Sequence, residues 1–259
     1  MKKSEIHPTA TIVTGATIGE GVSIGPYCVI GAHVKLGDGV RLEAHSIVDG
    51  HTTVGENCHI FPFASVGLQT QDLKYKGGIC SVEIGEGTTL REYVTVHAAT
   101  ADGDKTVVGK NCHILAYSHI AHDCIVGDSV IISNAGTLGG HVVVEDHAVI
   151  GGCTAIHQFV RVGRMAMIGG CSKVVQDVPP FMIADGHPAE VRALNKVGME
   201  RNGISADVQK QLRQAYKILF LKKVNLSQAI ERARKEIPKS VELSHLLKFL
   251  ESSERGIGR

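Results

Sequence analysis

A six-residue repeat constrains the fold of this chain more than any other feature of its sequence. Every sixth residue from Ile6 to Val174 is Ile, Leu or Val, and the only exceptions are Asp72, Gly78 and Asp102. A small or β-branched residue tends to follow each of these anchors by four places, and glycine often follows directly. Neither a helix nor a simple strand has a period of six. The repeat therefore predicts short strands joined by tight corners, since β-branched residues suit pleated surfaces and glycine relieves a corner backbone.

This pattern resembles that of the hexapeptide-repeat acyltransferases, and the resemblance covers residues 6–178. Their fold is a left-handed parallel β-helix with three six-residue units in each coil, and the handedness expected here comes from the resemblance alone. With 18 residues per coil, successive coils would lie about 4.8 Å apart, at ordinary strand spacing. The anchors and the residues four places after them are expected to point inward.

The composition favours a narrow interior and excludes some classes of function. The chain has 259 residues, 30 of them glycine, while aromatic residues make up 4% and tryptophan is absent. The net charge of +1 argues against a nucleic-acid-binding protein, which needs a dominant basic face. No segment approaches the roughly 18 apolar residues of a membrane-spanning helix, and polar residues stand where a secretion signal would have its apolar core. We expect a cytoplasmic protein.

The seven cysteines are expected to be reduced. Cys28, Cys58, Cys112 and Cys124 share the inward phase of the repeat, where a small side chain is wanted, so we interpret them as packing residues. A zinc site at "HIAHDC" would need a C-x-x-C pair or a second cluster, and the sequence has neither. We predict no metal.

The repeat is interrupted twice and then ends. Residues 67–83 and 97–107 break the series of anchors without changing its phase, so we expect two loops that leave the coils without disturbing their stacking. Loops on a rigid scaffold commonly carry function, although tolerated surface insertions would look the same. We predict a β-helical domain over residues 1–188 and an α-helical domain over 189–259.

The helical domain is predicted from caps and from helical spacing. Pro188 can start a first helix and Gly203 can end it, Ser205 can cap a second and Ser240 a last one. Apolar residues recur at helical spacing after the second cap, at Val208, Leu212, Ala215 and Leu219.

The stretch "HIAHDC" carries the candidate chemistry. Ile120 is an anchor and Cys124 is inward, so His119, His122 and Asp123 fall at phases outside the core. Imidazole can remove a proton from a hydroxyl group, and an adjacent carboxylate can orient it. The alternative is that these histidines merely pack against a neighbouring subunit. For His33, His45, His51 and His147, which recur at one phase, packing or solvent exposure is the favoured interpretation.

One coil after Asp123 comes His141, preceded by Gly139 and Gly140. This spacing places a second imidazole about one strand spacing from His122, with a backbone free of side chains between them. A glycine N–H is a good oxyanion donor because nothing blocks its approach. The arrangement is suited to acyl transfer to an alcohol without a metal or an acyl-enzyme serine.

Longer motifs narrow the resemblance. "TQDLKYKG", "HIAHDC", "GGHVVVED", "IGGCTAIHQF" and "QDVPPFMIADGHPA", in this order, are similar to those of the UDP-N-acetylglucosamine O-acyltransferases, which catalyse the first step of lipid A synthesis. The resemblance covers essentially the whole chain. It implies transfer of an (R)-3-hydroxyacyl group from acyl carrier protein to the glucosamine 3-hydroxyl of UDP-N-acetylglucosamine. It also implies a homotrimer with active sites between subunits, and no cofactor beyond the phosphopantetheine of the carrier protein.

The resemblance also implies roles for individual residues. His122 would be the general base, Asp123 its partner and Gly140 the oxyanion donor. Gly170 would face the acyl chain, where the lack of a side chain favours a longer donor. The other expected substrate-binding residues are Gln71, Asp72, Lys74, His97, His119, His141, His157, Gln158, Asn195 and Arg201. Among these, Gln158 and Asn195 would hold the nucleotide, and Arg201 would meet the pyrophosphate or the carrier protein.

Two positions depart from the family pattern, and other functions stay open. Asn202 stands where a second basic residue is usual, and "AAT" follows His97 where Arg-Gly-Thr is expected. Relatives that acylate an amino sugar, from acyl carrier protein or from acetyl-CoA, would need the same base, although "TQDLKY" and the helical tail argue against them. A non-catalytic scaffold with the same fold would make His122 and Asp123 dispensable.

Overall fold

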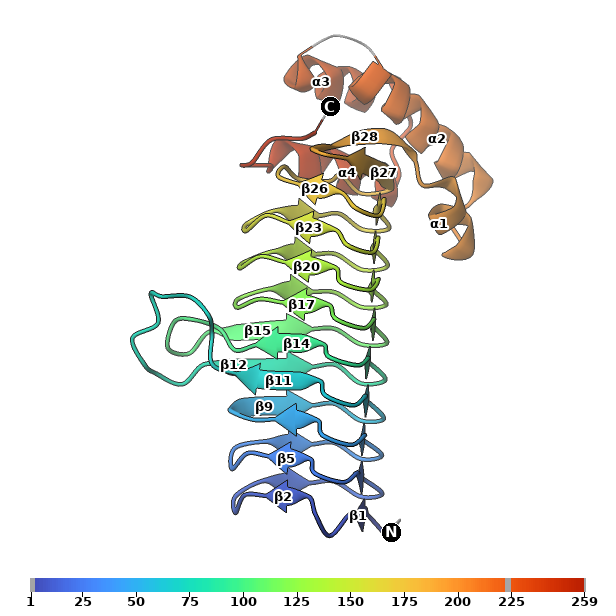
Figure 1. Cartoon of the computed structure of the whole chain (residues 1–259). Coiled ribbons are helices and arrows are strands. Elements are labelled where there is room, and N and C mark those ends of the chain that lie inside the picture. The colour runs from blue at the N-terminus through green and yellow to red at the C-terminus, as the bar shows by residue number, and fades with distance from the viewer. Residues whose placement is uncertain (1–2, 222–224, 259) are drawn as a thin grey trace.

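Short parallel strands recur every six residues and stack into a column, with a helical cap at its C-terminal end (Figure 1). The computed structural model describes residues 3–221 and 225–258. Each coil contributes one strand to each of three sheets. Sheet 1 contains β1 (Glu5–Ile6), β4 (Ser23–Ile24), β7 (Arg41–Leu42), β10 (His59–Ile60), β13 (Thr89–Leu90), β16 (His113–Ile114), β19 (Ile131–Ile132), β22 (Val149–Ile150), β25 (Met167–Ile168), β27 (Met182–Gly186) and β28 (Ala189–Leu194). Sheet 2 contains β2 (Thr11–Ile12), β5 (Val29–Ile30), β8 (Ile47–Val48), β11 (Ser65–Leu68), β14 (Thr95–His97), β17 (His119–Ile120), β20 (Thr137–Leu138), β23 (Ala155–Ile156) and β26 (Lys173–Val174). Sheet 3 contains β3 (Thr17–Ile18), β6 (Lys35–Leu36), β9 (His51–Val54), β12 (Ser81–Ile84), β15 (Lys105–Val108), β18 (Ile125–Val126), β21 (Val143–Val144) and β24 (Arg161–Val162). The parallel β-helix expected from the repeat is confirmed.

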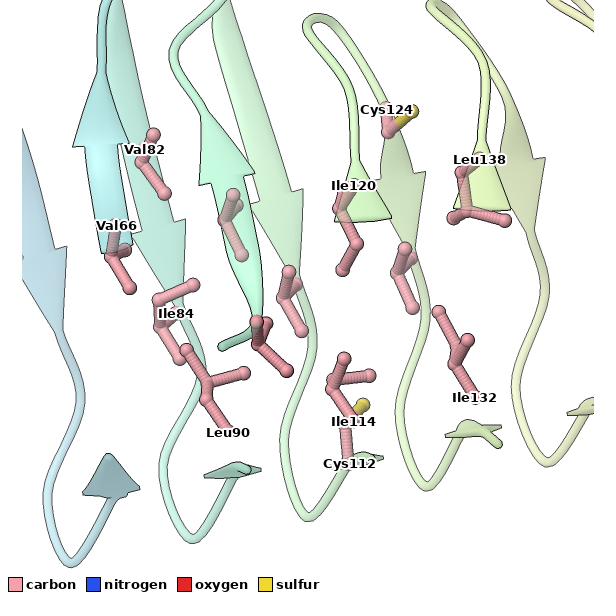
Figure 2. Close-up of a cluster of buried hydrophobic side chains, with 14 of the residues drawn as sticks. Val66, Val82, Ile84, Leu90, Cys112, Ile114, Ile120, Cys124, Ile132 and Leu138 are labelled. Atoms are coloured by element: carbon pink, nitrogen blue, oxygen red, sulfur yellow. The ribbon is translucent and has the colours of Figure 1, made fainter. Parts of the chain in front are cut away.

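The interior is formed by the anchors and by the residues four places after them. Ile84, Leu90, Ile114 and Ile132 point into the same narrow core (Figure 2). Burying one such side chain stabilises the fold by about 1.5–3 kcal/mol. The anchors of the first coil are less covered, and Ile6 is 47% exposed. The four cysteines predicted to pack inward are all buried and free, which confirms that interpretation.

Two coils are longer than the others, and each keeps the six-residue phase. Val54 pairs with Ile84 and Ile84 with Val108, so these steps cover 30 and 24 residues where other coils have 18. The additional residues are multiples of six, so the anchors stay inward. The chain leaves the column between Leu68 and Ser81 and again between His97 and Lys105, and both segments project from the same side (Figure 1).

The corners of the coils place their residues in columns. We call the turn from sheet 1 to sheet 2 corner 1–2, and the turn from sheet 2 to sheet 3 corner 2–3. The second turn residue commonly has a left-handed φ without being glycine, as at Asp123 (+60°) and His141 (+59°). His141 N–H donates to His122 O at 3.0 Å, one coil away. These hydrogen bonds offset the cost of the unusual backbone, and side chains on successive coils therefore stack.

In the residues that the structure describes, a hairpin and four α-helices follow the last coil at the C-terminal end of the column. β27 and β28 pair antiparallel, and α1 (Lys196–Arg201), α2 (Ala206–Tyr216), α3 (Leu226–Glu236) and α4 (Val241–Glu251) follow, with a π-helical turn at Lys217–Leu221. A second core, which includes Phe181, Met199 and Leu212, joins this region to the top of the column. No helix in residues 3–221 and 225–258 has the length and apolar character needed to cross a membrane.

The prediction that a helix begins at Pro188 is wrong. Pro188 lies in the turn of the hairpin, Ala189–Leu194 is a strand paired with Met182–Gly186, and the first helix begins only at Lys196. The segment therefore extends sheet 1 before it turns helical. The predicted caps are confirmed, because the side chain of Ser205 accepts a hydrogen bond from Val208 N–H and that of Ser240 accepts one from Leu243 N–H.

Candidate active site

Asp123 holds the imidazole of His122 at corner 2–3. The Asp123 N–H donates to Thr106 Oγ1 at 2.9 Å, and its carboxylate accepts a weak hydrogen bond from Thr100 N–H at 3.3 Å. The Oδ2 atom lies 2.7 Å from Nδ1 of His122. Because an ionised carboxylate can only accept, we assign the Nδ1 proton to this bond, which leaves the lone pair of a neutral imidazole on Nε2.

The loop after β11 extends across this imidazole. Asp72 N–H donates to Thr70 Oγ1, and Asp72 Oδ1 accepts from Lys74 N–H at 2.9 Å, so a local turn fixes the aspartate. Its Oδ2 lies 3.9 Å from Nε2 of His122. The His122 side chain is 13% exposed and that of Asp72 is 21% exposed. Nε2 of His122 is thus largely shielded from solvent but remains open to the adjoining pocket.

Gly140 and His141 lie one coil above His122. The rings of His122 and His141 are perpendicular with centroids 5.3 Å apart, and His141 Nε2 lies 3.6 Å from Asp123 Oδ2. A Cβ atom on Gly140 would overlap the imidazole of His122. Within the described residues, nothing accepts a hydrogen bond from the Gly140 N–H. The backbone of Gly140, which carries a free N–H among the described residues, therefore lies directly against the candidate base.

Two further histidines form the wall of the pocket on sheet 2. Burial, with the nearby imidazoles of His97 and His122, lowers the pKa of His119 to about 4. Burial and His122 also lower the pKa of His97, which is 7% exposed. His119 Nδ1 pairs with Thr95 Oγ1 at 2.7 Å, whereas His97 Nδ1 is buried without a partner among the described residues. Both rings are therefore neutral at pH 7 and can hydrogen bond to an uncharged ligand.

A pocket of about 530 Å³ brings many of the predicted residues together. Gln71, Asp72 and Lys74 contribute from the loop, His97 and His119 from sheet 2, and His122 and Gln158 from corner 2–3. A second pocket of about 460 Å³ is lined by Asp72, Lys74, Asp123 and His141, among others. Asp72 and Lys74 of the loop therefore contribute to both pockets.

His157 lies beside Gln158 at the upper end of this corner. Its Nδ1 atom is 3.1 Å from Gln158 O and 3.2 Å from a guanidinium nitrogen of Arg255. The C-terminal segment thus reaches back to the column next to the predicted site. This contact places Arg255 at the upper end of corner 2–3.

Three predicted residues lie away from His122 and its corner within one chain. Gly170 lies at corner 1–2, on the opposite edge of sheet 2 from His122. Asn195 is buried and caps α1, with its amide donating to Met165 O at 2.9 Å and accepting from Gly198 N–H at 2.9 Å. Arg201 is exposed at the last position of α1.

Four contributors were not predicted. Leu73 and Ala121 line the 530 Å³ pocket, and Thr100 and Thr106 hold Asp123. Thr106 shares the inward phase of Cys124. Its hydroxyl group, at a position where the repeat places core residues, was the signal in the sequence that could have identified it. Thr100 lies in an insertion without periodicity, and nothing in its sequence marks it.

The chain is similar to known acyltransferases over its whole length. Residues 15–50 and 105–140 match the bacterial transferase hexapeptide family, and residues 177–258 match the family described as UDP-N-acetylglucosamine O-acyltransferase, domain 2. An acyl-[acyl-carrier-protein]–UDP-N-acetylglucosamine O-acyltransferase of Thermodesulfovibrio yellowstonii is 52% identical over 99% of this chain and 100% of its own. The protein of the same name from Syntrophobacter fumaroxidans is 40% identical over 98% of this chain and 100% of its own.

Solved structures agree in fold. LpxA from Acinetobacter baumannii superposes with a TM-score of 0.94 and 43% identity over 98% of this chain and 99% of that one. LpxA from Bacteroides fragilis, a UDP-N-acetylglucosamine acyltransferase, superposes with a TM-score of 0.95 and 36% identity, over 98% of this chain and 100% of that one. These matches span nearly the full length of both chains, and the chain belongs to the acyl-[acyl-carrier-protein]–UDP-N-acetylglucosamine O-acyltransferase family.

Proposed function

We propose that this chain transfers an (R)-3-hydroxyacyl group from acyl carrier protein to the 3-hydroxyl of UDP-N-acetylglucosamine, the first step of lipid A synthesis, with His122 as general base. The observation that carries the proposal is the pairing of an oriented imidazole with a free backbone donor, Gly140 N–H, beside a 530 Å³ pocket. The names of the full-length relatives support the choice of donor and acceptor.

The reaction follows from this geometry. Nε2 of His122 removes the proton of the sugar 3-hydroxyl as its oxygen attacks the thioester carbonyl, and Asp123 stabilises the imidazolium. The carbonyl oxygen becomes an oxyanion, which accepts a hydrogen bond from the Gly140 N–H. Collapse of this intermediate breaks the C–S bond, and the phosphopantetheine thiolate receives the proton from His122. Every atom and proton is then accounted for without a metal or another cofactor.

The pocket residues divide by their chemistry. The loop residues Gln71, Asp72 and Lys74, together with the neutral His97 and His119, offer hydrogen bonds to the sugar. His141, His157 and Gln158 lie further along the same corner, on the path to the nucleotide and the donor. Several converging hydrogen-bonding side chains of this kind suit the hydroxyl groups of a sugar.

A homotrimer with active sites between subunits completes the proposal. Gly170, Asn195 and Arg201 lie away from His122 in one chain, so a neighbouring copy is the simplest source of their contacts to acyl chain and nucleotide. The cytoplasm, where acyl carrier protein donors are made and used, is the compartment that suits this reaction.

Transfer assays with two acceptors test the function. Purified protein is incubated with 3-hydroxyacyl carrier proteins of several chain lengths and either UDP-N-acetylglucosamine or its 3-amino analogue, and products are identified by mass and by alkali lability. We expect an alkali-labile ester on the hydroxyl sugar. Product formed only on the 3-amino analogue would show that the acceptor is the amino sugar. No transfer to either acceptor would reject the proposal.

A further inference from the structure

Two successive coils turn corner 1–2 with almost the same five residues. Residues 150–154 read IGGCT, and residues 168–172, one coil later, read IGGCS. Each segment leads into a strand of sheet 2, β23 or β26, and these two strands are neighbours in that sheet (Figure 1). In both segments two glycines precede a cysteine, which is Cys153 in the first and Cys171 in the second. The repeat therefore places two thiols at equivalent positions on adjacent coils.

The backbone gives these two cysteines the same orientation. Their φ angles are +55° and +57°, and their N–H groups donate to carbonyls of the coil below at 2.9 and 2.8 Å. Lower on the same corner, Tyr93 and Tyr117 occupy this position, and their rings stack with centroids 4.8 Å apart and 2° from parallel. Side chains at this position thus leave the column in one direction. The Cβ atoms of Cys153 and Cys171 are accordingly neighbours at ordinary strand spacing, about 4.8 Å.

These two cysteines differ from the other five in exposure and in bonding. Cys153 and Cys171 are exposed, whereas the other five are buried. Each buried cysteine donates its S–H to a backbone carbonyl, as Cys124 does to Gly139 O at 3.1 Å. Burial also raises the pKa of Cys124 to about 12. Within the described residues, neither exposed thiol has a hydrogen-bond partner, so thiol chemistry is concentrated at this pair.

The glycines before each cysteine leave the approach to the thiols open. A Cβ atom added at Gly170 would meet only backbone atoms of Gly152, the nearest at 3.3 Å. One added at Gly152 would first meet Asn134 O, at 3.2 Å, on the coil below. No side chain at these two positions therefore covers the sulfur atoms, and a small ligand can reach both of them.

The spacing of the thiols favours a bridging atom over a direct bond. A disulfide needs Cβ atoms about 3.5–4.5 Å apart, which is closer than stacked coils hold them. A metal ion between the sulfur atoms spans a longer gap. Zinc usually takes four protein ligands, and only two thiols meet here. Cu(I) is a soft ion that thiolates select, and two thiolates are enough to hold it.

We propose that Cys153 and Cys171 form a two-thiolate binding site for Cu(I). The two thiols release two protons as two Cu–S bonds form, and no electron is transferred. The site adjoins Gly170, where the acyl chain of the donor is expected, so bound copper acts as an inhibitor for long-chain donors and not as a cofactor. This effect on the donor rests on the proposed acyltransferase function, whereas the binding site does not.

Thiol counting tests whether the pair is accessible. Native protein is treated briefly with methyl methanethiosulfonate, a small thiol reagent, and the added groups are counted by mass. Two of the seven cysteines should react rapidly in the wild type, and one in Cys153→Ser or Cys171→Ser. The matched control is Cys80→Ser, which removes a buried thiol and lets serine donate to the same carbonyl, Ala101 O. It should keep two fast thiols. A wild type without rapid reaction would overturn the proposal.

Copper titration tests whether the two thiols act as one site. Cu(I) is supplied without oxygen from its coloured complex with bicinchoninate, and the loss of colour measures transfer to the protein. Wild type and Cys80→Ser should each bind one Cu(I) per chain, with two sulfur neighbours in X-ray absorption spectra. Cys153→Ser and Cys171→Ser should each bind on the order of 10²-fold more weakly, because one of two linked ligands is lost. Wild-type affinity in either variant, or no binding by wild type, would overturn the site.

Transfer assays test the effect on the donor separately. One equivalent of Cu(I) should lower the wild-type kcat/KM for long-chain donors on the order of 10²-fold, because the acyl chain is displaced. Cys153→Ser with the same amount of copper should keep its copper-free value. An equal loss in this variant would overturn the inhibition at corner 1–2. Wild-type protein that binds copper as described but transfers no acyl group to any acceptor would reject the proposed function and leave the copper site standing.

Discussion

At the scale of single residues, Asp123 organises the site by contacts to three different parts of the chain. Its N–H is bound by Thr106, its carboxylate accepts from Thr100 N–H, and Oδ2 pairs with His122. The sequence was sufficient to predict His122 and Asp123 because they fall outside the inward phases of the repeat. It could not predict Thr100, whose position depends on the path of an irregular loop.

Replacing this carboxylate tests its orienting role. Asp123→Asn should lower kcat by about 10²- to 10⁴-fold, the usual contribution of acid–base catalysis, because an amide neither fixes the Nδ1 proton nor stabilises an imidazolium. KM for the sugar nucleotide should change little, since Asp123 is not part of the 530 Å³ pocket. Steady-state kinetics measure both.

The control for this substitution is Asp128→Asn. Asp128 lies on another corner, where Oδ1 accepts a hydrogen bond from Lys110 N–H, and an asparagine oxygen can accept the same bond. This variant should keep wild-type kcat. A kcat for Asp123→Asn equal to that of Asp128→Asn would refute the orienting role.

The depressed pKa of His119 predicts acid sensitivity of the fold. Its pKa falls from the ordinary 6.5 to about 4, so between these values the unfolded chain binds a proton that the folded chain does not. The free energy of unfolding therefore rises with pH across this window. The contribution of His119 to it is lost as the pH falls through the same window. Thermal unfolding should show a lower midpoint at pH 5 than at pH 7, and His119→Asn should narrow that difference.

His7→Asn is the control for this measurement, because His7 is exposed on the first coil. It should preserve the wild-type difference between pH 5 and pH 7. An equally large difference in His119→Asn would show that His119 does not carry the effect.

At the scale of elements, the repeat specified the strands better than it specified their ends. Anchors mark each strand because their spacing is periodic, and the two insertions kept that period. The β27–β28 hairpin was missed because Pro188 is compatible both with a helix start and with a turn. Helix α3 was missed although Asn225 caps it and Ala229, Ile230 and Ala233 form its buried face.

Removing the first loop separates fold from activity. Deletion of residues 69–80 takes out twelve residues, two units of the repeat, and restores an 18-residue coil. The variant should keep its β-sheet circular dichroism and its cooperative thermal unfolding, but lose acyl transfer because Asp72 and Lys74 are gone.

Deletion of residues 69–78 is the matched control. Ten residues are not a multiple of six, so this shorter deletion leaves two extra residues, out of phase with the repeat, between Leu68 and Ser81 and should destabilise the column. If both deletions gave equally stable proteins, the phase would not be what holds the column together.

At the scale of the whole molecule, each coil contacts mainly its neighbours, so the column is built by local repetition. This is why its architecture could be predicted from six-residue spacing. Relations between distant coils are harder to predict: that Arg255 returns to His157, and that Gly170 lies across sheet 2 from His122, depend on the number of coils and on the corner at which each residue falls. The arrangement of copies depends on surfaces that the repeat does not encode.

The central claim is that His122 is the base of an acyl transfer at corner 2–3, and kcat/KM of wild type and His122→Ala tests it most directly. Both proteins are assayed with 3-hydroxyacyl carrier protein and UDP-N-acetylglucosamine, and circular dichroism and assembly mass are recorded on the same samples. We predict a loss of about 10²- to 10⁴-fold in kcat/KM, with fold and mass unchanged because His122 lies outside the core. Activity retained in the variant, or lost only together with fold or assembly, would contradict the account.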